Sequence, residues 1–71
     1  MFVRIRNLRE DADLTQENIA SLLNCSRSSY SRYEKGNRMI DIHDLIKLAN
    51  FYDVSLDYLV GRVDFKYGHR L

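Results

Sequence analysis

Apolar residues recur at spacings of three and four along most of this chain, which is the period of helices that bury one face. The first such stretch predicts a helix over about residues 2–12, with apolar positions at Phe2, Ile5, Leu8 and Ala12. Four further stretches follow, and each begins after a residue whose side chain can cap a helix N-terminus. The expected caps are Thr15, Ser26, Asp41 and Ser55. The pattern therefore predicts five short helices.

Composition favours a single all-α domain. The chain has 71 residues, no proline, three glycines and 45% apolar residues. These values favour compact helices over a β-sandwich or a disordered chain. A chain of this length forms one domain, near the size at which a single core is only marginally stable.

The stretch TQENIASLLNCSRSSYSRYEKG, from Thr15 to Gly36, predicts two of these helices joined by a tight turn. Ala20 is small enough to let two steeply crossing helices approach closely. Asn24 stands where the chain must turn, and asparagine accepts a left-handed backbone more readily than most residues. Gly36 is expected to end the second helix. Two short helices joined in this way predict a helix-turn-helix, whose second helix enters the DNA major groove.

The second helix of this pair, over residues 27–35, has an aromatic face and a hydrogen-bonding face. At about 100° per residue, Tyr30 and Tyr33 face inward and Glu34 lies at the edge of the core. A guanidinium matches guanine O6 and N7 in a bidentate fork, and short hydroxyls let the backbone approach base edges closely. The expected base-reading residues are Arg27, Ser28, Ser31 and Arg32.

Three segments resemble one known family. LTQENIASLLNCSRSSYSRYEKG, the overlapping LREDADLTQ before it and the later VSLDYLVGR are similar to the phage-repressor and Cro type of helix-turn-helix protein, the xenobiotic-response-element family. The resemblance covers roughly residues 2–62. It implies a compact five-helix, lambda-repressor-like DNA-binding domain with the helix-turn-helix at its second and third helices. The sequence departs from the family pattern at Asn24, Arg27, Ser28 and Tyr30, so the DNA sequence that is read does not carry over.

The resemblance also implies roles for residues around the motif. Arg9 is expected to pair with Glu34 and tie the first helix to the recognition helix, although a surface pair of little stability is the alternative. The loop after the motif is expected to lie along the DNA backbone, with Met39 and Ile40 covering the core. Gln16 stands at a helix N-terminus, where free N–H groups favour anions. The expected phosphate contacts are Gln16, Lys35, Asn37 and Arg38.

The net charge of +1 is small for a protein that binds nucleic acid, but the charges are unevenly distributed. Residues 27–38 contain four basic residues and one acid, whereas residues 41–57 contain four acids and one base. A domain with this distribution presents its basic face to phosphate. The alternative is that these charges only solvate helix faces. Arg4 and Arg6 are expected to be solvated, with phosphate contact as the alternative.

Other chemistry is expected to be absent. The single cysteine, Cys25, cannot form an internal disulfide and is expected to be a small buried thiol, with a redox-sensing thiol as the alternative. No Cys/His cluster suggests a metal or cofactor. His43 is expected to face solvent. No nucleophile lies near a plausible base, which argues against an enzyme. The charged N-terminus and the lack of a long apolar run predict a soluble, cytoplasmic protein.

The segment after Gly61 is expected to form a tail over residues 63–71 that follows a DNA-binding domain over residues 1–62. Apolar side chains in and before the tail are expected to contribute to a twofold dimer contact, with a frayed chain end as the alternative. The expected contact residues are Tyr58, Val60, Val63 and Phe65.

These expectations lead to a sequence-specific transcriptional regulator, expected to be a repressor, that reads the major groove of double-stranded DNA with the helix over residues 27–35. Because one module buries little DNA surface, a homodimer on an inverted-repeat operator is expected. The alternative is a protein-interaction module of the antitoxin or antirepressor-partner type on the same scaffold.

Overall fold

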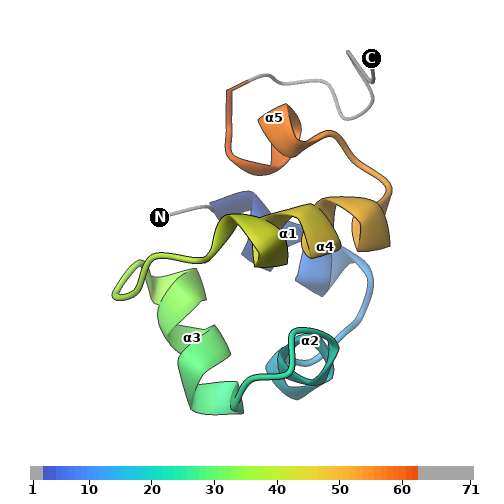
Figure 1. Cartoon of the computed structure of the whole chain (residues 1–71). Coiled ribbons are helices and arrows are strands. Elements are labelled where there is room, and N and C mark those ends of the chain that lie inside the picture. Colours follow the sequence, from blue (N-terminus) through green and yellow to red (C-terminus); the bar gives the residue numbers. More distant parts are fainter. Residues whose placement is uncertain (1–2, 63–71) are drawn as a thin grey trace.

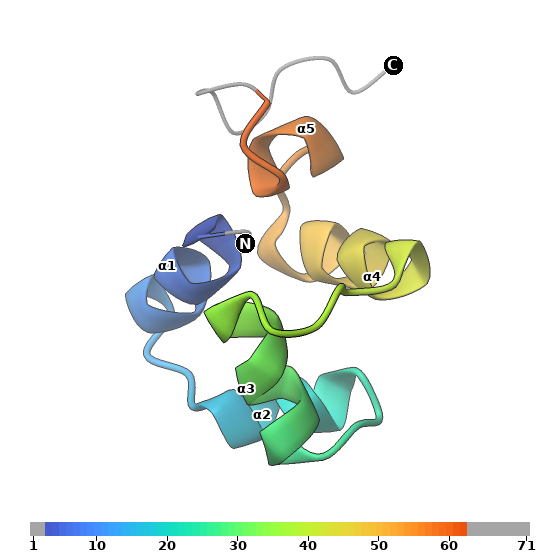
Figure 2. The same cartoon turned by 90° about the vertical axis from the view of Figure 1, so that its left-hand side faces the viewer.

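The computed structural model describes residues 3–62, which form five short helices joined by turns and loops. In order they are α1 (Val3–Asp11), α2 (Gln16–Leu22), α3 (Arg27–Lys35), α4 (Ile42–Tyr52) and α5 (Leu56–Leu59). Figures 1 and 2 show α2 and α3 together at one end and α5 at the opposite end, with α1 and α4 between them. The prediction of an all-α fold with five helices is confirmed. None of these helices is both long and apolar enough to cross a lipid bilayer.

The predicted caps satisfy backbone N–H groups that helix formation leaves without a partner. The Asn18 backbone N–H donates to Thr15 Oγ1 at 3.1 Å, and the Thr15 backbone N–H donates to Asn18 Oδ1 at 2.9 Å. This reciprocal capping box starts α2. The other three caps, Ser26, Asp41 and Ser55, likewise accept a backbone N–H at the start of α3, α4 and α5. The sequence indicated the caps but not the second bond of the box, in which the Asn18 side chain accepts the Thr15 N–H.

Residues with a left-handed backbone conformation end helices or turn the chain between them. Asn24 has φ 56° in the turn between α2 and α3, as predicted, and Gly36 has φ 79° at the end of α3. Asp13 (φ 57°) and Asp53 (φ 54°) also adopt this conformation, which the sequence analysis did not predict. Aspartate tolerates it because its short polar side chain can hydrogen-bond locally.

The core joins all the helices around the aromatic face of α3. Tyr30 is fully buried and Tyr33 is 8% exposed, and their rings meet edge to face at 6.4 Å. Ala20, on α2, is 2% exposed, as expected where two helices cross closely. The other fully buried large side chains are Ile5, Ile19, Leu48 and Leu59. This packing directs the opposite face of α3 toward solvent.

Two apolar residues are exposed: Met39, which was expected to cover the core, and Ile42, which helical spacing places on the apolar stripe of α4. Met39 is 84% exposed and Ile42 is 52% exposed, whereas Ile40 is buried as predicted. Since Ile40 turns inward in the loop, its neighbour Met39 faces outward. Ile42 lies in the first turn of α4, beside the buried stripe that Leu45 and Leu48 form, so helical spacing alone placed it wrongly.

The C-terminal end of α1 differs slightly from the prediction. The helix ends at Asp11, so Ala12 follows it and is exposed, and Phe2 lies outside the described residues. Arg4 is not solvated as expected. Its Nη1 donates to the Tyr58 carbonyl at 2.9 Å, and its guanidinium lies 4.1 Å from the centre of the Tyr58 ring. The helices α1 and α5 pack against each other, and the contacts of Arg4 with Tyr58 link them.

Candidate nucleic-acid interface

The recognition helix α3 is anchored at both ends and along its inner face. Ser26 Oγ accepts the Ser29 backbone N–H at 3.1 Å, and Gly36 closes the C-terminus with a left-handed backbone. With Tyr30 and Tyr33 buried, the polar residues lie on the outer face. Arg27, Ser28, Arg32 and Lys35 are exposed, and Ser31 is half-buried. The fold thus holds these side chains outward on a rigid helix.

Seven of the eight residues expected to contact DNA line one open concavity of about 410 Å³, which we call the recognition concavity. Its lining residues are Gln16, Arg27, Ser28, Ser31, Arg32, Lys35 and Asn37. All four expected base-reading residues are among them, and so are three of the four expected phosphate contacts. Residues far apart in the sequence, from α2, α3 and the following loop, therefore meet at one polar surface.

Arg38, the remaining phosphate candidate, does not line this concavity. Its Nη1 donates to Ser29 Oγ at 3.4 Å, and its guanidinium lies 5.7 Å from the centre of the Tyr33 ring. Both contacts are weak, and the residue is exposed. The Arg38 guanidinium is therefore held against α3 only by weak contacts.

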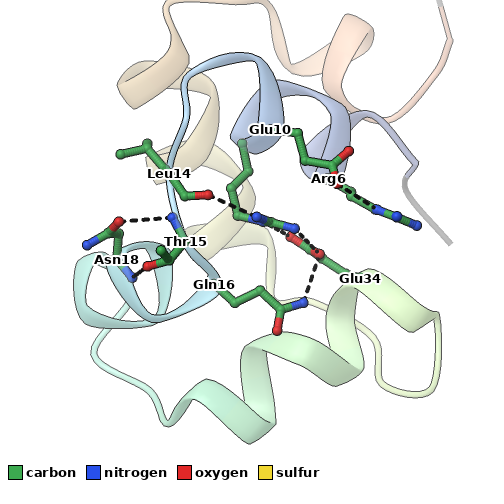
Figure 3. A network of polar contacts seen from close by, with 8 residues as sticks. Arg6, Glu10, Leu14, Thr15, Gln16, Asn18 and Glu34 are labelled. Atoms are coloured by element: carbon green, nitrogen blue, oxygen red, sulfur yellow. Dashed lines mark hydrogen bonds and ion pairs between the residues drawn. The ribbon is translucent and has the colours of Figure 1, made fainter.

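A bidentate ion pair fixes α3 against α1 (Figure 3). Arg9 Nε and Nη2 donate to the two carboxylate oxygens of Glu34 at 2.7 and 3.1 Å, and Arg9 Nη1 donates to the Leu14 carbonyl at 2.9 Å. The Arg9 and Glu34 side chains are 12% and 4% exposed. The pair is therefore buried, unlike the weak surface pair that was the alternative to it.

Gln16 is held by the same carboxylate. Its Nε2 donates to Glu34 Oε1 at 3.1 Å, and Figure 3 shows its side chain reaching from α2 toward α3. This bond was not predicted from the sequence. The one signal for it is that Gln16 and Glu34 are both polar residues at the edge of the same helix pair. The bond leaves the amide oxygen and one N–H of Gln16 for a ligand in the recognition concavity.

The surrounding groups hold Glu34 in its charged form. Burial alone would raise the pKa of Glu34, but the hydrogen bonds from Arg9 and Gln16 and the positive charge of Arg9 outweigh burial and lower it below the ordinary value of 4.5. Burial and the nearby Glu34 carboxylate raise the pKa of Tyr30, and burial raises the pKa of Tyr52 to about 12. Both phenols are therefore neutral at physiological pH. Burial also raises the pKa of the half-buried Cys25 thiol.

Acid is therefore expected to destabilise the fold through Glu34. A carboxylate whose pKa is lower in the folded than in the unfolded chain stabilises the fold above its unfolded pKa, and that stability is lost as pH falls through the folded value. The free energy of unfolding should fall as pH drops below about 4.5. Denaturant titrations at several pH values measure this dependence.

Glu34→Gln removes the titrating group and is the variant that tests the assignment. It should be less stable than the parent chain at neutral pH, and the difference should shrink in acid. Glu17→Gln, at an exposed carboxylate on α2, serves as the control. A stability difference between Glu34→Gln and the parent chain that stays constant between neutral pH and pH 3 would contradict the role of Glu34.

The residues expected at a dimer contact are only partly within the described range. Tyr58 and Val60 are half-buried and pack against the core. The Arg4 guanidinium lies over the Tyr58 ring. Val63 and Phe65 lie outside the described residues. Among residues 3–62, no cluster of three His, Cys, Asp or Glu side chains is placed to hold a metal ion.

These features define a helix-turn-helix domain, and the chain belongs to the helix-turn-helix family: the family model HTH_3 (Helix-turn-helix) matches residues 5–59. The resemblance to phage-repressor and Cro-type regulators is thus confirmed. The chain is 41% identical over 59 residues to the HTH-type transcriptional regulator ImmR of Bacillus subtilis, an alignment that covers 83% of this chain and 46% of that protein.

Other relatives carry similar names. The cryptic phage CTXphi transcriptional repressor RstR of Vibrio cholerae is 39% identical over 58 residues, covering 82% of this chain and 52% of RstR. A transcriptional regulator from Listeria innocua has a crystal structure that superposes with a TM-score of 0.82 at 31% identity, covering 97% of this chain and 65% of that one. The chain spans about half the length of the curated relatives it matches.

Proposed function

We propose that this chain is a sequence-specific, double-stranded DNA-binding transcriptional regulator, and specifically a repressor. The recognition concavity carries this proposal, because it gathers guanidinium, ammonium, amide and hydroxyl groups from three segments on one face. Within the described residues, Arg27, Arg32 and Lys35 form no ion pair, so their charges are available to DNA. The repressor names among the relatives support the direction of regulation.

In this proposal, α3 enters the major groove. Arg27, Ser28, Ser31 and Arg32 read base edges, since guanidinium and hydroxyl groups match the donors and acceptors that bases present there. Phosphate contacts fix the position of the helix along the duplex. The proposed phosphate contacts are Gln16, Lys35, Asn37 and Arg38. This mechanism requires no metal, no cofactor and no catalysis. We place the protein in the cytoplasm because the mechanism requires access to DNA.

Selection of bound sequences from a random pool of DNA duplexes tests the proposal. The expected result is one enriched motif arranged as an inverted repeat, with half-sites about one helical turn apart. Enrichment of unrelated sequences would contradict sequence-specific reading, and a single unrepeated motif would contradict a symmetric dimer.

Substitution of the phosphate candidates separates positioning from base reading. Lys35→Ala and Arg38→Ala are each expected to weaken binding to all duplexes alike and to reduce the slope of log K against log[salt] by about 0.9, because each removes one phosphate contact. Fluorescence anisotropy at several salt concentrations measures the slope. Lys47→Ala, at an exposed lysine on α4, is the matched control and should leave the slope unchanged. A sequence-dependent loss for Lys35→Ala would instead assign Lys35 to base reading.

We also propose that the regulator is a homodimer with a contact formed by Tyr58, Val60, Val63 and Phe65. Partial exposure of Tyr58 and Val60 at α5, at the opposite end from the recognition concavity, supports this contact. Sedimentation equilibrium of the parent chain and of Phe65→Ser tests it. A dimer that persists unchanged in Phe65→Ser would exclude Phe65 from the contact.

The second candidate function is a protein-interaction module on the same scaffold. It is favoured by four exposed apolar side chains at and before α4, those of Met39, Ile42, Ile46 and Phe51. Ile46→Ser distinguishes the two functions, since the residue lies outside the recognition concavity. Loss of a protein partner with DNA binding intact would support the module, whereas unchanged partner binding would argue against it.

A further inference from the structure

A second concavity, of about 350 Å³, continues the polar surface from α2 and α3 onto α1, and we call it the α1 concavity. It shares Gln16 and Lys35 with the recognition concavity. Its other lining residues are Arg6, Arg9, Glu10 and Glu34. Figure 3 shows Arg6 and Glu10 on α1, on the same side of the molecule as the contact between Gln16 and Glu34.

The charges in the α1 concavity differ in how strongly they are held. Arg9 and Glu34 neutralise each other in the buried pair, with side chains 12% and 4% exposed, so neither is available to a ligand. Arg6 Nε and Glu10 Oε2 lie 3.4 Å apart, and their side chains are 60% and 51% exposed. Exposed pairs of this spacing on a helix contribute little stability. The Arg6 guanidinium can therefore leave Glu10 at little cost.

We propose that Arg6 contacts a DNA phosphate and that Glu10 weakens this contact by competing for the same guanidinium. The inference rests on the proposed DNA-binding function. Phosphates recur about every 3.4 Å of helix axis along each strand, so a backbone that Gln16 and Lys35 contact presents further phosphates to a neighbouring cation. Exchanging a weak surface carboxylate for a phosphate also releases a condensed counterion, which favours binding. Glu10 thereby sets how tightly the domain holds any duplex without affecting which bases it reads.

Arg62 provides a matched control. Its Nη1 lies 3.5 Å from Asp57 Oδ1, and the Arg62 and Asp57 side chains are 76% and 43% exposed, so the pair resembles that of Arg6 and Glu10. It follows α5 in the chain. Figures 1 and 2 show α5 at the opposite end from α2 and α3. An arginine there has the same effect on net charge as Arg6 but lies away from the proposed DNA path.

The experiment measures duplex affinity against salt for the full chain, Arg6→Ala, Arg6→Lys and Arg62→Ala. Arg6→Ala is expected to reduce the slope of log K against log[salt] by about 0.9 on every duplex. Arg6→Lys should restore the slope because it keeps the charge, and Arg62→Ala should match the parent chain. Equal slopes for Arg6→Ala and Arg62→Ala would overturn the proposed contact. Thermal unfolding of each variant shows that the fold is intact.

Glu10→Gln tests the competition. It is expected to tighten binding to all duplexes at low salt, with a larger gain when Arg6 is present than in the Arg6→Ala background, while Asp57→Asn changes nothing. An equal gain in both backgrounds would overturn the competition for Arg6. Failure of the parent chain to bind any duplex would overturn the proposed function and this inference with it. Binding by the parent chain with no effect at Arg6 would overturn the inference alone.

Discussion

Arg9→Ala is expected to lower the free energy of unfolding by about 3–5 kcal/mol, the usual cost of removing one partner of a buried ion pair. Glu34, whose side chain is 4% exposed, would keep its charge without the two hydrogen bonds that Arg9 donates. Gln16 donates one bond to the same carboxylate and compensates only in part. Since the net stability of a folded domain is only about 5–15 kcal/mol, this change removes a large share of the stability. Urea denaturation followed by circular dichroism measures the change.

The matched comparison is Arg62→Ala, which removes an arginine from an exposed pair and should cost less than about 1 kcal/mol. A double variant, Arg9→Met with Glu34→Leu, should be much less destabilised than the sum of the single changes, since neither charge is left buried alone. A loss of under about 1 kcal/mol for Arg9→Ala would show that the pair behaves as a surface pair.

Arg27→Ala and Arg32→Ala are each expected to weaken binding to the selected operator by about 1–3 kcal/mol, the discrimination that one bidentate contact to a guanine provides. Both side chains are exposed, lie in the recognition concavity and form no ion pair within residues 3–62. Their loss should therefore leave the fold intact and reduce the preference for the operator over unrelated DNA. Anisotropy titrations with the operator and with a scrambled duplex measure both affinities.

The scrambled duplex separates base reading from charge. If Arg27 or Arg32 contacted only phosphate, its removal would weaken binding to both duplexes by the same factor and leave the preference unchanged. Such a result would remove that residue from the base-reading set. Ser28→Ala and Ser31→Ala can then show which of the short hydroxyls contributes to the preference that remains.

The helices and the outward face of α3 followed from local features of the sequence. The helix starts were predictable because the capping side chains can accept a backbone N–H. The caps are Thr15, Ser26, Asp41 and Ser55. The burial of Tyr30 and Tyr33 follows from helical spacing, and the left-handed backbone of Asn24 follows from the chemistry of asparagine. These features depend on residues close in the sequence, so the sequence alone is sufficient to find them.

Features that depend on distant residues could not be found in this way. Arg4 contacts Tyr58, and Gln16 shares Glu34 with Arg9, only because α1, α2, α3 and α5 pack in one particular arrangement. The outward orientation of Met39 depends on which neighbour the loop turns toward the core. Helical spacing describes one element at a time and gives no information about the element packed against it.

The pair of Arg9 and Glu34 was accessible only through the family resemblance. Nothing in the spacing of two residues 25 positions apart indicates that they meet. The structure adds what the resemblance did not give, which is that Glu34 also holds Gln16. One buried carboxylate thus fixes the position of α3 and orients a proposed phosphate contact.

Titration of isotope-labelled chain with the selected duplex, followed by NMR, tests most directly whether the outer face of α3 reads DNA. The largest chemical-shift changes are expected at residues 27–38 and at Gln16, with α5 nearly unchanged. Changes centred on α4 and α5, or no change with any duplex at modest ionic strength, would contradict DNA recognition by this face.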